Sequence, residues 1–351
     1  MKYPAPLEFS ALVPTLEQFD AIIDVRSPSE YALDHIPGAV NFPVLDDAQR
    51  IVVGTLDKQV NSFEAKKVGA ALVSKNIGRY LEENWLDMPR DWKPLIYCWR
   101  GGNRSGAMAH VLARVGWPVI QLEGGYKAYR NFVNAELEKA PGLSFKVVCG
   151  TTGSGKSRLL EVLASIGAQV LDLEQLAAHR GSVLGNLPSQ PQPSQKRFET
   201  LIWDKLRHFD PALPVFVESE SKKVGQLRVP AALMDEMRAA PCIALSLSRE
   251  NRVRLLMEDY QHFTINPAEL NTQLDCLLKM YGREKINSWH DLANSGRMPE
   301  LVAELLEQHY DPAYLRSIDR NFTQFASAEL VELDDISPQH FLDAARSLHA
   351  G

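Results

Sequence analysis

Cysteine is scarce in this sequence of 351 residues, long apolar runs are missing, and positive charge is not in excess. The spacing of the four cysteines excludes CxxC metal sites, and their number is too low for a secreted disulfide framework. No segment approaches the roughly 20 apolar residues that cross a bilayer, and the N-terminus has no apolar signal region. We therefore expect a cytoplasmic protein that does not enter a membrane.

The charge balance gives no sign of a polyanion as partner. The chain has 38 Lys and Arg against 44 Asp and Glu, a net charge of -6, so no global positive field predicts nucleic-acid binding. A local basic groove can still bind a polyanion on an acidic protein. The apolar fraction of 45% and the charged fraction of 23% are typical of a globular chain, and the length favours two domains.

Strand-like and helix-like segments alternate in the first part of the chain. In order, we predict a strand ending at Asp24, a helix over 29–33, a strand after the turn at 36–38, a helical insertion over about 55–88, the strand KPLIYC, a helix over 105–115, the strand PVIQLEG and a helix over 126–138. This alternation predicts a parallel sheet covered by helices on both faces, which is an α/β domain.

Turn-forming residues in KAPGLS, 139–144, mark a domain boundary. We assign 1–140 to a first α/β domain and 141–351 to a second. The second begins with the strand FKVVC, continues with a helix over 155–165 and the strands AQVLDL, PVFVES and CIALSLS, and then becomes mostly helical up to a last strand, AELVEL. We therefore expect a second α/β unit with a helical C-terminal extension.

The segment GTTGSGKS fits the Walker A pattern G-x-x-x-x-G-K-[ST], and it lies between a predicted strand and a predicted helix. Its backbone amides and the helix N-terminus can hold phosphate, the lysine adds a charge, and the last serine can hold Mg²⁺. The eight candidate positions are Gly150, Thr151, Thr152, Gly153, Ser154, Gly155, Lys156 and Ser157. The sequence predicts a phosphate-binding loop here.

Carboxylates follow the next two strands. An NTPase usually has an aspartate after its third strand, whereas this sequence offers Glu218 and Glu220, which leaves nucleotide hydrolysis open. Asp172 and Glu174 follow the second strand, where small-molecule kinases place substrate-binding groups. The alternative is that they only cap the next helix.

The segment YCWRGGNRSG places a cysteine after a strand and before a helix. Backbone amides and the helix dipole at such a position favour the thiolate, and Gly101 and Gly102 let the loop amides converge on an anion that Arg100 or Arg104 can also bind. The alternative is that Cys98 is a packing thiol at a strand end. We interpret Cys149, Cys242 and Cys276 as core residues without chemistry.

The motifs IIDVRSPSEY, HIPGAVNFP, the Cys98 loop and LEGGYKAY occur in the order found in rhodanese (sulfurtransferase) domains, which residues 15–138 resemble. Single-domain rhodaneses typically have four residues between the cysteine and the loop-closing arginine, but five separate Cys98 from Arg104. The wider loop resembles that of rhodanese-fold phosphatases. However, residue 97 is a tyrosine where cysteine phosphatases usually have histidine.

With GTTGSGKS, DLEQLAAHRGSVLG, VESESKKVG and EQHYDPAY added, nearly the whole chain resembles the tRNA 2-selenouridine synthase family. The resemblance implies exchange of the sulfur of wobble 2-thiouridine for selenium from selenophosphate, through an S-geranylated intermediate made from geranyl diphosphate. It implies no tightly bound cofactor, leaves a role for Mg²⁺, and places a functionally sensitive glycine at Gly69. In it, the Walker-type loop holds the diphosphate, and Cys98 either carries selenium or positions it.

Basic clusters in the second half make it our candidate for binding the tRNA anticodon arm. The candidate cations are Lys196, Arg197, Lys222, Lys223, Arg228, Arg249 and Arg252. His179 and Arg180, in HRGSVLG, are further candidates, although a lone histidine beside a turn is commonly structural. Taken singly, each basic cluster is also explained as a solvated helix face.

Two other functions compete with the tRNA-modifying transferase. One is a P-loop phosphotransferase or NTPase carrying a sulfurtransferase or phosphatase-like rhodanese domain. The other is a binding module in which neither loop is catalytic. The sequence does not distinguish oligomeric states.

Overall fold

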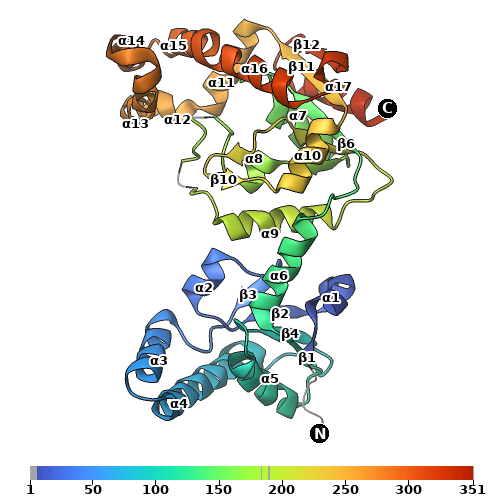
Figure 1. Ribbon diagram of the computed structural model, residues 1–351, viewed down its shortest axis with the longest axis vertical. Helices are drawn as coiled ribbons and strands as arrows, with labels where there is room; N and C mark the ends of the chain where they lie inside the picture. The colour runs from blue at the N-terminus through green and yellow to red at the C-terminus, as the bar shows by residue number, and fades with distance from the viewer. Residues whose placement is uncertain (1–5, 183, 189, 351) are drawn as a thin grey trace. The chain divides into compact units, whose positions relative to one another are not determined.

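The computed structural model describes residues 6–182, 184–188 and 190–350 (Figure 1). The chain divides into two compact units, the first comprising Met1–Glu136 with Glu199–Trp203 and the second comprising Leu137–Phe198 with Asp204–Gly351. Both units are α/β, as predicted. No helix in the described ranges is long and apolar enough to span a membrane.

The first unit contains a parallel five-stranded sheet in the order β1-β5-β4-β2-β3. Its strands are β1 (Pro6–Leu7), β2 (Ala21–Asp24), β3 (Ala39–Asn41), β4 (Pro94–Tyr97) and β5 (Ile120–Leu122). The sequence predicted all of these except β1, a two-residue edge strand too short to show a pattern. Buried apolar residues on β2 and β4 pack against the helices, as in a sheet covered on both faces.

Helices connect the strands of this unit. They are α1 (Phe9–Leu12), η1 (Val13–Gln18), α2 (Pro28–Leu33), α3 (Asp47–Gln59), α4 (Ser62–Tyr80), η2 (Leu81–Trp85), α5 (Asn103–Val115) and α6 (Gly125–Leu137). The predicted insertion is helical, but it begins at Asp47 rather than near residue 55. The reason is a capping box, in which the Asp46 carboxylate accepts from the Gln49 amide and the Gln49 side chain accepts from the Asp46 amide.

The second unit has its own parallel five-stranded sheet, in the order β12-β11-β6-β8-β7. Its strands are β6 (Phe145–Cys149), β7 (Gln169–Leu171), β8 (Val215–Glu218), β11 (Cys242–Leu247) and β12 (Glu329–Leu333), and the sequence predicted each of them. A short antiparallel hairpin, β9 (Lys223–Val224) with β10 (Leu227–Arg228), was not predicted.

Helices cover this sheet and then form a separate layer near the C-terminus (Figure 1). Those that follow the sheet strands are α7 (Lys156–Ser165), α8 (Leu173–Leu176), α9 (Gln195–Leu206), α10 (Ala231–Ala239) and α17 (Pro338–Ala350). The extension contains α11 (Arg249–Asp259), α12 (Gln261–Ile265), α13 (Pro267–Leu274), η3 (Asp275–Leu277), α14 (Leu278–Asn294), α15 (Met298–Leu305), η4 (Leu306–Tyr310), α16 (Asp311–Asn321) and η5 (Phe325–Ser327). The extension has its own apolar core around the fully buried Trp289.

Candidate functional site

The Cys98 loop joins the carboxyl end of β4 to the N-terminus of α5. Gly102 has φ = +76°, a left-handed conformation in which glycine avoids the penalty of a side chain, and it brings the chain into the helix as its N-cap. The side chain of Cys98 is only 3% exposed and packs partly on the core, while Arg100 and Gly101 are exposed. The loop therefore presents its charged side chains outward with the sulfur beneath them.

One hydroxyl contacts the Cys98 sulfur. Ser105 Oγ lies 3.3 Å from Cys98 Sγ and can donate to it. Gln121 Nε2 donates to the same Oγ at 3.0 Å, so one lone pair of the hydroxyl is occupied by a donor from β5. The Ser105 proton is then available to the sulfur or to the carbonyl oxygen of Gly102, also at 3.3 Å. A sulfur held by a donor in this way is better placed for chemistry than one buried among apolar groups alone.

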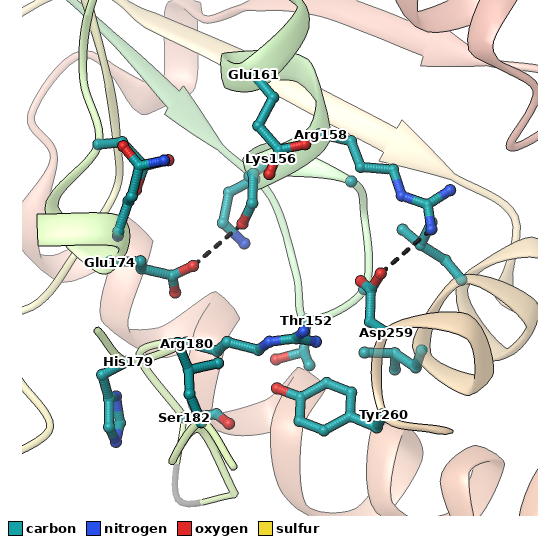
Figure 2. A pocket seen from close by; sticks show the side chains of 18 of the residues that line it. Thr152, Lys156, Arg158, Glu161, Glu174, His179, Arg180, Ser182, Asp259 and Tyr260 are labelled. Carbon is teal, nitrogen blue, oxygen red and sulfur yellow. Dashed lines mark hydrogen bonds and ion pairs between the residues drawn. The ribbon is translucent and has the colours of Figure 1, made fainter. Parts of the chain in front are cut away.

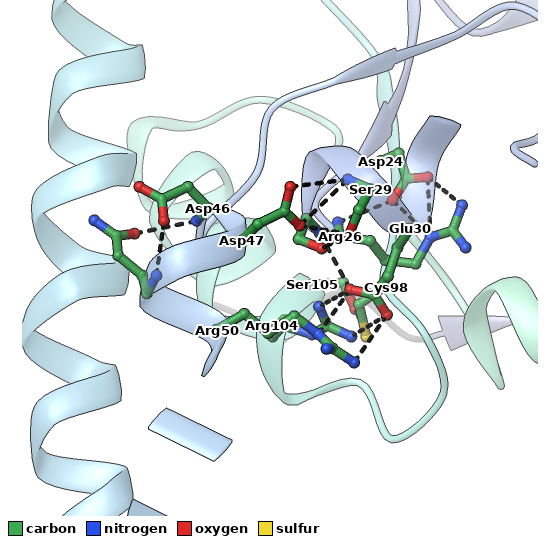
Figure 3. Close-up of polar contacts among 12 residues, drawn as sticks. Asp24, Arg26, Ser29, Glu30, Asp46, Asp47, Arg50, Cys98, Arg104 and Ser105 are labelled. Atoms are coloured by element: carbon green, nitrogen blue, oxygen red, sulfur yellow. Dashed lines mark hydrogen bonds and ion pairs between the residues drawn. The ribbon is translucent and has the colours of Figure 1, made fainter. Parts of the chain in front are cut away.

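Arg104, the loop-closing arginine, is held by a carboxylate that the sequence analysis did not single out. Arg104 Nη1 lies 2.9 Å from Glu30 Oε2, and Arg50 Nε, on α3, contacts the same oxygen at 3.0 Å (Figure 3). Burial alone would raise the pKa of Glu30, but the hydrogen bond and charge of Arg104 lower it below its usual value. Asp47, which accepts from Ser29 Oγ and interacts with Arg50, adds a second carboxylate, so two guanidinium groups and two carboxylates lie beside the loop.

The motif IIDVR forms a buried support under this network. Arg26 Nη2 pairs with Asp24 Oδ2 at 2.6 Å, and its guanidinium lies 3.9 Å from the ring centroid of Tyr126. Arg26 also donates to the carbonyl oxygen of Asp34 at 2.7 Å, which fixes the end of α2. Because a buried pair needs all of its partners, this arrangement positions α2 and hence Glu30.

The glycines of LEGGYKAY let α6 approach the Cys98 loop. A Cβ on Gly125, where φ is +58°, would lie 2.3 Å from the carbonyl oxygen of Cys98, too close for any side chain. The amide of Tyr126 donates to that oxygen at 2.7 Å, and the amide of Lys127 donates to the Trp99 oxygen at 3.0 Å. The N-terminus of α6 therefore fixes two peptide planes of the loop.

Gly69 lies on α4, buried against α3. A Cβ there would be 3.4 Å from Val53 Cγ1, an ordinary contact, and a longer side chain would extend from this buried position toward α3. Since α3 also carries Arg50, which pairs with Glu30, crowding at Gly69 would displace a partner of the Cys98 loop. A side chain longer than that of alanine at residue 69 is therefore expected to disturb the partners of the loop.

We expect Gly69→Glu to destabilise the protein by about 1–3 kcal/mol and to lower any activity at the Cys98 loop at least about tenfold, because overpacking separates α3 from α4. Gly69→Ala should be tolerated. Gly78→Glu is the matched control, since Gly78 is on the same helix with nothing within 4 Å of its Cβ position. Equal losses of stability and of activity in the Gly69→Glu and Gly78→Glu proteins, with stability measured by thermal unfolding, would contradict the explanation.

The Walker-type loop of the second unit follows β6 and ends at the first residue of α7, Lys156. Gly153 and Gly155 have φ of +76° and +91°, and a Cβ on either would lie within 3 Å of Leu256 or Phe341 side-chain atoms. Both positions therefore require glycine. The sequence motif and the predicted context, strand before and helix after, agree with the structure.

Lys156 is 8% exposed and lies across its own loop. Its Nζ donates to the carbonyl oxygen of Gly150 at 2.7 Å and lies 4.8 Å from the ring centroid of Tyr314, in the motif EQHYDPAY. Burial lowers the pKa of this ammonium group, while the carboxylates of Glu174 and Glu220 oppose that shift. An incoming phosphate would supply the charge partner that the lysine needs.

Three of the four predicted carboxylates have raised pKa values. Burial raises the pKa of Asp172 to about 6, and burial together with neighbouring carboxylates raises those of Glu218 and Glu220 well above their usual value. Glu218 Oε1 accepts from the Glu174 amide at 2.7 Å, while Ser157 Oγ donates to Glu174 Oε2 at 3.1 Å. Of these four residues, Asp172 and Glu174 line the cavity beside the loop, while Glu218 and Glu220 are buried.

For Asp172, the sequence left two roles open, substrate binding and capping of the next helix. Its carboxylate caps α8 by accepting from the Gln175 amide at 2.7 Å, and it also lines the cavity beside the Walker-type loop. Within the described residues, no group of three or more His, Cys, Asp and Glu side chains is arranged to hold a metal ion.

The cavity at this loop has a volume of about 310 Å³. Figure 2 shows the side chains of Lys156 and Glu174 on one side and those of Arg158 and Asp259 on the other. Arg158 Nη2 pairs with Asp259 Oδ1 at 3.2 Å, and the Arg180 guanidinium lies 4.6 Å from the Tyr260 ring centroid. The lining also holds the carboxylates of Glu161, Asp172, Glu174 and Asp259, so it is the Walker-type loop and the helix N-terminus, with Lys156, that favour a phosphate group here.

The remaining candidates lie in different surroundings. His179 is 5% exposed, and its Nδ1 accepts from the Gly181 amide, while burial lowers its pKa, so it lines the cavity as a neutral ring. Arg252 is 7% exposed and donates to the Thr152 carbonyl oxygen at 2.7 Å, pairing also with Asp311. Its guanidinium therefore supports the Walker-type loop from within the protein rather than facing solvent for tRNA.

The other basic candidates for tRNA are dispersed. Lys223 and Arg228 are exposed and lie directly opposite each other on the β9–β10 hairpin, with Lys222 exposed beside them. Arg249 pairs with Glu307 at 2.6 Å while about half exposed. Lys196 and Arg197 are in the first turn of α9. Of these, the hairpin alone gathers three cations in one short segment.

The sequence analysis did not single out several residues of these sites: Glu30, Arg50, Ser105, Arg158, Tyr260 and Tyr314. Glu30 had a signal, because Ser27 and Glu30 form a capping box directly after the strand that ends at Asp24. Tyr314 falls in a motif already noted for the resemblance. For Arg158 and Tyr260 we see no local pattern.

Two folds and two loops together define the class of this protein: a rhodanese-like domain joined to a P-loop domain. A rhodanese-like domain family matches residues 8–132, and the tRNA 2-selenouridine synthase AAA domain family matches residues 143–275. A tRNA 2-selenouridine synthase of Sulfurovum sp. (strain NBC37-1) is 32% identical over 86% of this chain and 89% of its own. One from Shewanella denitrificans (strain OS217) is 31% identical over 93% and 94%.

A third relative, the tRNA 2-selenouridine synthase of Nitrosomonas europaea (strain ATCC 19718), is 36% identical over 68% of this chain and 63% of its own. This chain belongs to the tRNA 2-selenouridine synthase family. Members of the family are tRNA-modifying enzymes, which agrees with the expectation from the sequence.

Proposed function

We propose that this protein replaces the sulfur of 2-thiouridine at the wobble position of tRNA with selenium from selenophosphate, by way of an S-geranylated intermediate made from geranyl diphosphate. The observation that supports it most is the pairing of two anion sites on separate units: the arginine-rich Cys98 loop and the cavity at Lys156. Selenophosphate is a small anion suited to the first, and a diphosphate is suited to the second.

In the first step, the thiocarbonyl sulfur attacks C1 of the geranyl group, and the C–O bond breaks as the diphosphate leaves with the electron pair. Lys156, the loop amides and the N-terminus of α7 stabilise the charge that develops on the leaving oxygen. Ser157 with Glu174 would hold a Mg²⁺ ion arriving with the diphosphate. No ATP hydrolysis is needed.

In the second step, selenium attacks C2 of the alkylated base and geranylthiol leaves, taking up a proton. Selenium in selenophosphate and sulfur in a thiol are both fully reduced, so a perselenide on Cys98 would need an oxidant. Of the two roles considered for Cys98, we therefore favour positioning of selenophosphate for delivery, with Arg104 and Arg50 balancing its charge. Selenium keeps its oxidation state throughout, because water then cleaves the Se–P bond at phosphorus and leaves selenouridine and phosphate.

The tRNA is placed on the second unit in this proposal. The exposed cations Lys222, Lys223 and Arg228, on and beside the β9–β10 hairpin, are the ones best arranged for phosphate contacts. Such contacts suit the single-stranded anticodon loop.

The proposal is tested by omitting one substrate at a time. Purified protein is incubated with tRNA containing 2-thiouridine, and the nucleosides are analysed by mass spectrometry. Without selenophosphate, S-geranyl-2-thiouridine should accumulate; with both substrates, selenouridine should form. Selenouridine made without geranyl diphosphate would exclude the intermediate. ATP turnover stimulated by a small acceptor, with no tRNA product, would favour the phosphotransferase alternative.

A further inference from the structure

A second cavity, lined almost wholly by apolar side chains, adjoins the phosphate cavity within the second unit. The two cavities share Thr152, Ser182, Leu256 and Tyr260 as wall residues. Beyond this shared wall, the second cavity is lined by residues of the helical extension, among them Phe263, Leu270, Leu301, Val302, Leu305 and Leu306. The apolar cavity therefore begins at the Walker-type loop itself, of which Thr152 is a part.

Tyr260 marks the border between the two cavities. The Arg180 guanidinium lies 4.6 Å from its ring centroid, and the Phe263 ring stacks on it with centroids 5.8 Å apart and planes 11° from parallel. Figure 2 shows Tyr260, Thr152 and Ser182 together at one edge of the phosphate cavity. An anionic group on one side of this border would meet Arg180 and the Walker-type loop, and an apolar group on the other side would meet Phe263 and its apolar neighbours.

Four α-helices supply most of the apolar wall, and Leu306 and Tyr310 of η4 add to it. Leu256 comes from α11, Phe263 from α12, Leu270 from α13, and Leu301 with Val302 from α15. These side chains belong to the apolar core of the extension, so the cavity, about 60 Å³ in volume, is a gap within a packed core that borders the anion site at the shared wall. A ligand that joins a diphosphate to a hydrocarbon chain would complement both parts at once.

We propose that this second cavity binds the hydrocarbon chain of the allylic diphosphate and selects its length. The inference rests on the proposed function, to which it adds the residues that hold the chain. With the diphosphate at Lys156 and the chain among the extension helices, the reacting C1 carbon would be at the shared wall. The helical extension is then part of the substrate site rather than only a packing element.

The size of the expected effect follows from the hydrophobic effect. Each methylene moved from water into an apolar cavity tightens binding by about fourfold. Geranyl diphosphate exceeds dimethylallyl diphosphate by one five-carbon unit, so the intact protein should bind it more tightly by a factor on the order of 100, allowing for the cost of ordering the chain.

The test compares the affinities of the full-length protein for inorganic pyrophosphate and for dimethylallyl, geranyl and farnesyl diphosphates, by titration calorimetry. Val302→Trp fills the cavity and should remove most of the preference for geranyl over dimethylallyl, while pyrophosphate affinity changes less than about twofold. Val302→Ala should shift the preference toward farnesyl. Met280→Trp, on an exposed position of α14, is the control for added bulk and should behave as the unaltered protein.

An unaltered length preference in Val302→Trp would overturn the inference, as would the absence of any preference in the unaltered protein. If Val302→Trp fails to fold in thermal unfolding, the shift toward farnesyl in Val302→Ala decides the matter alone. A clear length preference without tRNA geranylation would overturn the proposed function but support the cavity. Geranylation of tRNA without a length preference would support the proposed function and overturn the role of the cavity.

Discussion

Replacing Cys98 with alanine is expected to lower selenouridine formation at least about 10³-fold, while S-geranylated tRNA still accumulates. The substitution removes the sulfur that Ser105 contacts at 3.3 Å, and it leaves the second unit, with its phosphate cavity, untouched. Mass spectrometry of digested tRNA measures both nucleosides in one experiment. This variant should therefore carry out the geranylation step but not the exchange of sulfur for selenium.

Cys276→Ala is the matched control. The sequence analysis interpreted Cys276 as a core residue, which is wrong, because this cysteine is exposed, and it is far in sequence from either loop. It should give normal amounts of both products. If Cys98→Ala made selenouridine at the normal rate, the Cys98 loop would have no part in the chemistry. If it lost geranylation as well, the two sites would not act independently.

Replacing Lys156 with alanine is expected to have the opposite effect and to lower geranylation by about 10²–10³-fold. The lysine is the one charged side chain of the Walker-type motif, and removing a donor to a developing anion in a buried site has an effect of this order. The rate is measured as S-geranyl-2-thiouridine formed from geranyl diphosphate in the absence of selenophosphate. Binding of inorganic pyrophosphate should weaken in parallel.

A second substrate makes this test specific. When tRNA that already carries S-geranyl-2-thiouridine is supplied with selenophosphate, Lys156→Ala should convert it to selenouridine normally. Lys279→Ala, exposed on α14, is the control for loss of a positive charge and should retain both steps. Normal geranylation by Lys156→Ala would remove the Walker-type loop from the proposed reaction.

Local patterns in the sequence were sufficient to predict most of the fold and both loops. The strands are short apolar runs bounded by turn residues, and the Walker-type glycines follow one of them, so each signal lies within about ten residues. The insertion boundary was misplaced because α3 is largely polar, with its start fixed by the capping box at Asp46 rather than by apolar periodicity.

Contacts between distant segments could not be predicted in this way. Glu30 meets Arg104 across more than seventy residues, and Arg252 meets Thr152 across a hundred. Nothing in the residues next to Arg252 distinguishes a buried cation from one on a solvated helix face, so the sequence analysis took it as a contact for tRNA. Tyr260 likewise becomes a border between cavities only when four helices pack together.

The close approach of α6 to the Cys98 loop has a consequence for recognising such loops in uncharacterised genomes. Only a residue without a side chain can occupy position 125, since a Cβ would meet the Cys98 carbonyl oxygen. The Cys98 loop, which follows β4, imposes this requirement for glycine, but the glycine itself is the first residue of α6, which follows β5. A search that demands this distal glycine together with the cysteine would therefore select chains by three-dimensional fit, and it would reject chance matches to the short loop pattern.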